Sequence, residues 1–374
     1  DAAEARKRAI EMGLDDERVV AELGDDLLQS GQIDEALHLY EQLSADEPRN
    51  PAYQLKLSEI YMGQHDLVKA RAALNKAKQA DPANLSVRFN EANLLQQEGH
   101  VDQAITVLQG ILTDTERKQY SEPEKKNRAL FMEKLAFFYK LNQQYPLAIE
   151  TFQKLSAMDP DIAPEASVQI IETYKDQKDY TAAMREAESA VKKFPKEPAV
   201  TVEHAQLLAD VGKVDPAAAE VRGLFNGKQD RAFDLQLAQI YEKGKRWNEM
   251  AQALDDMEKL SPTSEEKAEV YFMRGAMLER QKKFDLSEAE FRKVLAINPN
   301  SDNALNYLGY MLADRNVRLD EAYDMVKKAL ELNPDNGAYL DSLAWVYYRQ
   351  GKFSDAEGLL VRALQKQPDP TVHD

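Results

Sequence analysis

The chain has 374 residues, of which 43% are apolar and 30% are charged, and its formal net charge is −17 with a pI near 4.9. This acidity disfavours nucleic acid and anionic lipid surfaces, because phosphates bind clusters of Lys and Arg that the sequence does not concentrate anywhere. Basic or neutral partners are favoured instead. Cysteine is absent, which excludes disulfides and thiolate chemistry, and no apolar run is long enough for membrane insertion.

Prolines mark a regular period along the chain. Pro48 and Pro82 lie 34 residues apart, and Pro299 and Pro334 lie 35 apart. Each interval reads as two amphipathic helices, with apolar residues three and four apart and a Gly or polar turn between the helices. A fixed period of this length indicates a repeat protein in which each unit packs against its neighbours.

Two residue classes recur at fixed phases of this repeat. Small residues occupy one phase of the second helix, where a large side chain would hold two crossing helices apart. These are Ala36, Ala70, Ala104, Ala148, Ala183, Ala322 and Ala356. Tyrosines are expected to fill the space between the first and second helices. These are Tyr61, Tyr139, Tyr174, Tyr241 and Tyr347. Gly24 and Gly275 are expected at close contacts.

The chain divides into six segments in this pattern. Residues 1–16 hold the second helix of a truncated repeat, 17–112 hold three repeats, 113–128 form a polar insertion, 129–230 hold three repeats, 231–368 hold four, and 369–374 begin a further truncated repeat. The insertion is interpreted as a solvated spacer that lengthens two helices and their loop, with a dedicated binding element as the alternative. A repeat array needs polar caps, so we expect a piece of a longer protein whose uncapped ends allow self-association.

These features resemble the tetratricopeptide repeat (TPR) family, whose 34-residue units are helix–turn–helix pairs. The resemblance covers essentially the whole chain. Its ten units start near Glu17, Pro51, Leu85, Ala129, Pro164, Pro198, Arg231, Ala268, Asp302 and Gly337. It implies an all-α fold, a right-handed superhelical solenoid whose first helices line the concave face. The sixth unit, with "DVGKVDPAAAEVRGLFNGKQD", is degenerate and is expected to be the weakest part.

Catalytic chemistry has little support in the sequence. The five histidines are scattered without metal-ligand spacing, and there is no Gly-rich phosphate loop or Gly-x-Ser-x-Gly motif. Asp25 with Asp26 and Glu265 with Glu266 are interpreted as acidic pairs at helix starts, and Thr263 with Glu266 forms a capping-box pattern. The sequence therefore predicts no enzyme, no cofactor and no metal site.

By the resemblance, binding residues lie on the concave face, at first-helix phases beside the buried stripe. The candidate residues are Phe89, Asn93, Phe272, Asn306, Tyr310, Asp341, Trp345, Tyr348 and Arg349. Their aromatic, amide and charged side chains are of the kinds found in interface cores. In the alternative interpretation, Tyr310 and Trp345 pack between neighbouring first helices or against a further unit.

The segment "ALNYLGYMLADRNVRLDEAYDMVKKALELNPDNGAYLDSLAWVYYRQGKFSDAEGLL" resembles bacterial TPR proteins of the cell envelope, including lipoprotein adaptors that deliver substrates to periplasmic proteases. The resemblance implies a non-catalytic scaffold or adaptor that binds a protein or peptide in its groove. It also implies a location in the periplasm or on an outer-membrane lipid anchor, while a cytoplasmic location stays open. The alternative is a regulatory or substrate-recruiting arm of an enzyme whose catalytic domain lies outside this chain.

Overall fold

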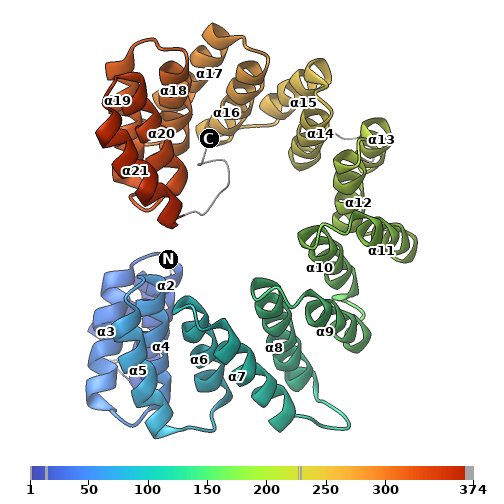
Figure 1. The fold of residues 1–374 in the computed structure, drawn as a ribbon. Helices are drawn as coiled ribbons and strands as arrows, with labels where there is room; N and C mark the ends of the chain where they lie inside the picture. Colours follow the sequence, from blue (N-terminus) through green and yellow to red (C-terminus); the bar gives the residue numbers. More distant parts are fainter. Residues whose placement is uncertain (1, 13–15, 226, 228–229, 367–374) are drawn as a thin grey trace. The chain divides into compact units, whose positions relative to one another are not determined.

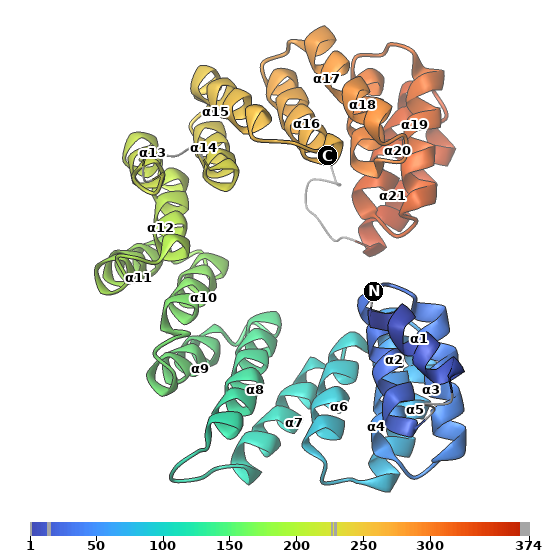
Figure 2. The same ribbon diagram turned by 180° about the vertical axis from the view of Figure 1, so that it is seen from behind.

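The computed structural model describes residues 2–12, 16–225, 227 and 230–366. Over these residues the regular secondary structure consists of 21 α-helices and no strand (Figure 1). The all-α fold expected from the sequence is confirmed. Successive helices pack side by side in pairs, seen from opposite sides in Figure 1 and Figure 2. The chain divides into two compact units, residues 1–200 and 201–374.

The first unit contains one leading helix followed by five helix pairs. Its helices are α1 (Ala2–Glu11), α2 (Glu17–Gln29), α3 (Ile33–Asp46), α4 (Pro51–Gly63), α5 (Leu67–Ala80), α6 (Leu85–Gln97), α7 (Val101–Asp114), α8 (Glu122–Leu141), α9 (Tyr145–Met158), α10 (Ala163–Asp176) and α11 (Tyr180–Lys193). The even-numbered helices are first helices and the odd-numbered helices are second helices. Ala3 of α1 is buried against Leu23 and Leu27 of α2, so α1 packs as a second helix does.

The second unit continues the same alternation. Its helices are α12 (Pro198–Asp210), α13 (Val214–Gly223), α14 (Arg231–Lys243), α15 (Trp247–Lys259), α16 (Ser264–Arg280), α17 (Phe284–Ile297), α18 (Asp302–Asp314), α19 (Leu319–Leu332), α20 (Gly337–Arg349) and α21 (Phe353–Lys366). The first residues of α12 precede the division at residue 200. The predicted start of a further repeat at 369–374 lies outside the described residues, as do residues 226, 228 and 229 of the degenerate sixth repeat.

The turn inside each pair has one recurrent backbone geometry, in which a residue soon after the first helix has a positive φ angle. These residues are Gly31, His65, Gly99, Gln143, Lys178, Gly212, Lys245, Lys282, Asn316 and Gly351. At Gly99 the backbone N–H donates to the Gln96 carbonyl (3.0 Å), and the following His100 N–H donates to the Leu95 carbonyl (2.8 Å). This pattern closes the helix end. It therefore recurs whether or not the sequence supplies a glycine there.

The two helices of a pair approach closely at the positions where small residues were predicted. Ala36, Ala70 and Ala322 have no exposed surface. A Cβ atom at Gly24 would lie 2.7 Å from the Tyr40 ring, so the backbone itself makes this contact. The prediction that small residues allow close helix crossing is confirmed.

The tyrosines of the first helices are also placed as predicted, and they have a further role. Tyr61 is only 9% exposed. Its hydroxyl donates a hydrogen bond to Glu41 Oε1 of the preceding second helix (2.9 Å). The Tyr139 hydroxyl accepts from Gln109 Nε2, again on the preceding second helix (2.7 Å). Each ring thus contributes to packing, while its hydroxyl links one repeat to the next.

Most of the polar segment 113–128 is helical. The start of α8 at Glu122 precedes the predicted repeat start at 129, because Ser121 and Glu124 form a capping box that begins the helix earlier. Similarly, α16 starts at Ser264, and the predicted capping box of Thr263 and Glu266 is confirmed. Only residues 115–121 connect α7 to α8.

The interpretation of Asp25 and Asp26 as residues of a helix start is wrong. Both lie in the second half of α2. Asp25 Oδ1 accepts a hydrogen bond from the Tyr40 hydroxyl (2.8 Å) and pairs with Lys56 Nζ (2.9 Å). This carboxylate therefore joins successive helices of the array.

The left-handed turn gives a direct test of stability. Gly99→Ala should lower the free energy of unfolding by about 1 kcal/mol, because an alanine at this φ angle strains the backbone. No atom lies within 4 Å of the added Cβ, so packing does not contribute. Gly63→Ala, in equally open space at the end of α4, is the control and should not destabilise. Urea unfolding followed by circular dichroism measures both, and equal losses in the two variants would contradict the argument.

The sixth pair should exchange amide hydrogens fastest. Its second helix α13 has 10 residues, whereas α19 and α21 have 14 each, so α13 has fewer turns over which to bury apolar surface. Hydrogen exchange measured by mass spectrometry should show residues 214–223 less protected than residues 319–332. Equal protection of the two segments would sink this prediction.

Candidate functional site

The nine predicted binding residues all lie on first helices. Phe89 and Asn93 lie on α6 in the first unit, and the other seven lie on α16, α18 and α20 in the second unit. The candidates therefore form two groups, one in each compact unit.

The first group lies in a hollow of about 390 Å³ among three consecutive first helices. We call it the amide hollow. Its lining residues are Glu59, Met62 and Gly63 of α4, Phe89, Asn90, Asn93, Gln96 and Gln97 of α6, and Lys134 of α8. Both predicted residues of this group, Phe89 and Asn93, thus line one cavity. Asn90 and Gln97 were not predicted as concave-face residues, although they stand at neighbouring phases of the same helix.

The floor and wall of the amide hollow are fixed by packing. Asn90 is buried, and its Nδ2 donates to Glu59 Oε1 (3.1 Å) and to the Ser86 carbonyl (3.1 Å). The centroid of the Phe89 ring lies 5.3 Å from the centroid of the Phe131 ring of α8. Asn93 is only partly buried, which leaves its amide at the surface of the hollow. An amide offers both a donor and an acceptor, so the hollow can pair with either kind of polar group.

The second group contains an aromatic surface on α18 and α20, which we call the aromatic face: Tyr310, Trp345, Tyr348 and Arg349. Trp345 stacks on Tyr348, with ring centroids 5.3 Å apart and planes 12° apart. The guanidinium carbon Cζ of Arg349 lies 5.7 Å from the centroid of the Trp345 ring. Tyr310 is 42% exposed and Tyr348 is 51% exposed, so two of the three rings present much of their surface to solvent.

Other members of the predicted set have packing contacts. Trp345 and Phe272 both pack against the main core cluster of the second unit, and the Phe272 ring contacts the rings of Phe291 (5.5 Å) and Tyr307 (5.4 Å). The indole Nε1 of Trp345 and Oδ1 of Asn306 are buried without a hydrogen-bond partner in the described part of the chain. Trp345 therefore contributes to the core as well as to the aromatic face.

Negative charge surrounds Tyr310. Burial raises the pKa of the Tyr310 hydroxyl, and the carboxylates of Asp314, Asp341 and Glu279 raise it further. Burial also raises the pKa of Glu279, to which the charge of Asp314 adds. The sequence pattern missed Glu279 and Asp314, because the phases chosen for the concave face on these two helices fall at Phe272, Asn306 and Tyr310 instead.

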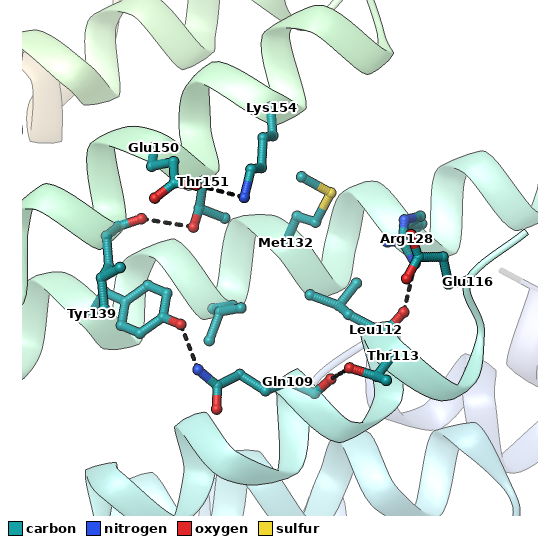
Figure 3. A pocket seen from close by; sticks show the side chains of 12 residues that line it. Gln109, Leu112, Thr113, Glu116, Arg128, Met132, Tyr139, Glu150, Thr151 and Lys154 are labelled. Carbon is teal, nitrogen blue, oxygen red and sulfur yellow. Dashed lines mark hydrogen bonds and ion pairs between the residues drawn. The ribbon is translucent and has the colours of Figure 1, made fainter.

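A second kind of hollow lies between consecutive second helices, and the sequence pattern did not predict it. Figure 3 shows one example, of about 510 Å³, between α7 and α9 over α8. Gln109 and Tyr139 are hydrogen-bonded on one side of it, and Glu150 pairs with Lys154 (2.7 Å) on another. A similar hollow of about 520 Å³ lies between α3 and α5 over α4, with Tyr61 in its lining. The recurrence of these hollows follows from the repeat.

Two ionisable groups of the second unit, Asp234 and His204, are buried within the helix array. Asp234 of α14 is 2% exposed, and its Oδ2 has no hydrogen-bond partner among the described residues. Burial, followed by the charges of Asp256 and Asp230, raises its pKa to about 6. His204 is 9% exposed, and its Nδ1 lies 2.9 Å from Glu220 Oε2. Neither group is open to a substrate, so both are packing features.

Within the described ranges, no three His, Asp or Glu side chains gather as a metal site would require. Likewise, none of the helices seen there combines the length and apolar character needed to cross a membrane.

The raised pKa of Asp234 predicts a pH-dependent stability. In the unfolded chain this carboxyl group has a pKa near 3.8, and in the folded chain about 6. The folded state thus binds the proton more tightly, and stability falls as the pH rises between these values. Near neutral pH, Asp234→Asn should raise the free energy of unfolding by about 1–3 kcal/mol. Below the unfolded pKa it should have little effect.

Urea unfolding of wild type and Asp234→Asn at several pH values tests this expectation. Asp324→Asn, at an exposed carboxylate on α19, is the control for a simple change of net charge. A gain for Asp234→Asn that does not depend on pH would contradict the assignment.

Known proteins share the repeat. Models of the tetratricopeptide repeat match residues 21–84, 62–121, 268–301 and 312–374. The chain is 37% identical over 168 residues to a TPR repeat-containing protein of Pseudomonas aeruginosa. The matched region makes up 44% of this chain and 28% of that protein. Over 396 residues the chain is 26% identical to cellulose synthase operon protein C of Pseudomonas fluorescens, covering 90% of this chain and 30% of that protein. The chain spans less than a third of the length of either relative.

Among solved structures, yeast Tom70 has a similar fold, with a TM-score of 0.54 at 14% identity over 94% of this chain and 92% of that chain. At this identity the similarity concerns the fold alone. The helix pairs, with their left-handed turns and close crossings at small residues, agree with the four segments that match the repeat models. The chain therefore belongs to the tetratricopeptide repeat family.

Proposed function

We propose that the chain is a non-catalytic scaffold or adaptor that binds an extended segment of a partner protein along its first helices. A TPR fold is in general a protein-interaction scaffold, and the amide hollow is the observation that supports this particular mode. It combines four amide side chains, an aromatic ring and one charge of each sign on three consecutive first helices.

The chemistry of the amide hollow suits a peptide backbone. Each residue of an extended segment offers one N–H donor and one C=O acceptor, and each Asn or Gln side chain can pair with both. Phe89 offers apolar contact beside these amides. Because Asn90 is already held by Glu59, Asn93 and Gln96 are the amides that we assign to the partner.

We further propose a location in the bacterial cell envelope, where the chain would assist assembly or deliver a partner to a periplasmic protease. This rests on the resemblance of residues 304–360 to envelope TPR proteins and on the two Pseudomonas relatives. An enzyme arm that recruits substrates through the same hollow would show the same binding behaviour, and an activity assay of the full-length protein separates it from an adaptor.

Removal of the two assigned amides tests the proposal. Proteins captured by the immobilised chain from a bacterial envelope fraction are identified by mass spectrometry, and the strongest is purified. The Asn93→Ala/Gln96→Ala variant should bind that partner about tenfold more weakly or worse, because each lost hydrogen bond contributes about 1 kcal/mol.

Gln103→Ala/Gln153→Ala is the matched control. It removes two exposed amides from the second helices α7 and α9, and it should bind as the wild type does. Thermal melts establish that both variants are folded. Full affinity in a folded Asn93→Ala/Gln96→Ala variant would count against the amide hollow as the binding site.

A further inference from the structure

We propose that Glu279, Asp314 and Tyr310 together bind a positively charged side chain, Lys or Arg, of a partner protein. This inference extends the proposed scaffold function to the second unit and gives the partner a specific chemistry. It rests on that function only in taking the partner to be a protein.

Repeat geometry brings the two carboxylates together. Phe272 of α16 and Tyr307 of α18 are in ring contact, with centroids 5.4 Å apart. Glu279 follows Phe272 by seven residues, and Asp314 follows Tyr307 by seven residues. Seven residues are two helical turns, so each carboxylate lies on the same helical face as its ring. Because first helices of successive repeats run in the same direction, Glu279 and Asp314 meet further along the two helices.

The electrostatics agree with this placement. The charge of Asp314 raises the pKa of Glu279, in addition to the effect of burial. Two nearby carboxylates repel each other unless a cation lies between them. In the described part of the chain, neither Glu279 nor Asp314 is in an ion pair, although each is followed directly by an arginine. Arg280 pairs with Glu242, and Arg315 pairs with Asp285 (3.5 Å). The neighbouring cations are therefore directed to other carboxylates.

Tyr310 supplies the third element of the site. It precedes Asp314 by one helical turn, is 42% exposed, and has both Glu279 and Asp314 among the charges that raise its pKa. A cation near an exposed tyrosine ring gains cation–π attraction in addition to the carboxylate charges. An aromatic ring beside two carboxylates suits the apolar stem and charged end of Lys or Arg.

The observations favour an organic cation over a metal ion. In the described ranges no group of three acidic or histidine side chains is close enough to hold a metal, and this site has two carboxylates next to an exposed ring. Trp345 follows Tyr310 by 35 residues, at the same repeat phase of the next first helix, and it stacks on Tyr348, which is 51% exposed. This surface can accept apolar residues beside the basic one, as a protein segment supplies and a small polyamine does not.

The test uses Trp345 as the reporter. The protein has two tryptophans, so a Trp247→Phe background leaves Trp345 alone. Acetylated pentapeptides Gly-Leu-X-Leu-Gly, in which X is arginine, lysine, citrulline or norleucine, are titrated while its fluorescence is followed. The arginine and lysine peptides should bind about tenfold more tightly than their neutral counterparts, and added salt should reduce the difference.

Two variants assign the preference to the site. Glu279→Gln/Asp314→Asn should lose the difference between charged and neutral peptides and should melt at or above the wild-type temperature, because a repulsion is removed. Asp324→Asn/Glu357→Gln removes the same charge from exposed positions on α19 and α21, and it should retain the preference. Tyr310→Leu keeps the carboxylates but removes the ring, and it should weaken binding of both cationic peptides.

Three results would overturn the proposal: equal binding of the arginine and citrulline peptides, an unchanged preference in Glu279→Gln/Asp314→Asn, or no saturable binding of either cationic peptide. Stronger binding of spermidine than of the peptides would overturn the choice of a protein partner. Because the amide hollow lies in the other compact unit, failure here leaves the result for Asn93→Ala/Gln96→Ala independent.

Discussion

The close crossing of first and second helices is the constraint on which this molecule depends. Ala36, Ala70 and Ala322 of the second helices have no exposed surface. At Gly24 of a first helix, even a methyl group would collide with the Tyr40 ring. Such tight packing gives each helix a fixed rotation about its axis. Because that rotation repeats, residues at one phase of successive first helices come to the same side, as Glu59 and Asn93 do around the amide hollow.

Sequence periodicity predicted the features that depend on residue size and spacing. The alanine positions, the tyrosines between helices and the Thr263–Glu266 capping box followed from the pattern because each contact is local or repeats in register. The turns were harder to recognise. His65 and Lys178 adopt the left-handed conformation that Gly31 adopts elsewhere, and nothing in those residue types marks the position.

The candidate sites were less predictable, since they depend on how side chains choose among several partners. Trp345 stands at a phase beside the buried stripe, where a large ring reaches both the core and the surface. Glu279 and Asp314 stand out only because the arginine that follows each of them pairs with a different carboxylate. Arg280 pairs with Glu242, and Arg315 pairs with Asp285. The sequence contains these arginines but does not say which carboxylate each one selects.

The choice of ion-pair partners also affects where the net negative charge of the chain is found. Many of its cations join one repeat to the next, as Arg274 pairs with Glu258 (2.8 Å) and Arg292 with Glu321 (2.7 Å). Partly exposed pairs of this kind contribute little to stability individually, but they hold positive charge within the array. With 65 acidic and 48 basic residues, carboxylates remain in excess at the surface. In the function we propose, positive charge on the partner is attracted over this broad surface, and specificity comes from the few places, such as Tyr310, where carboxylates lie beside an exposed ring.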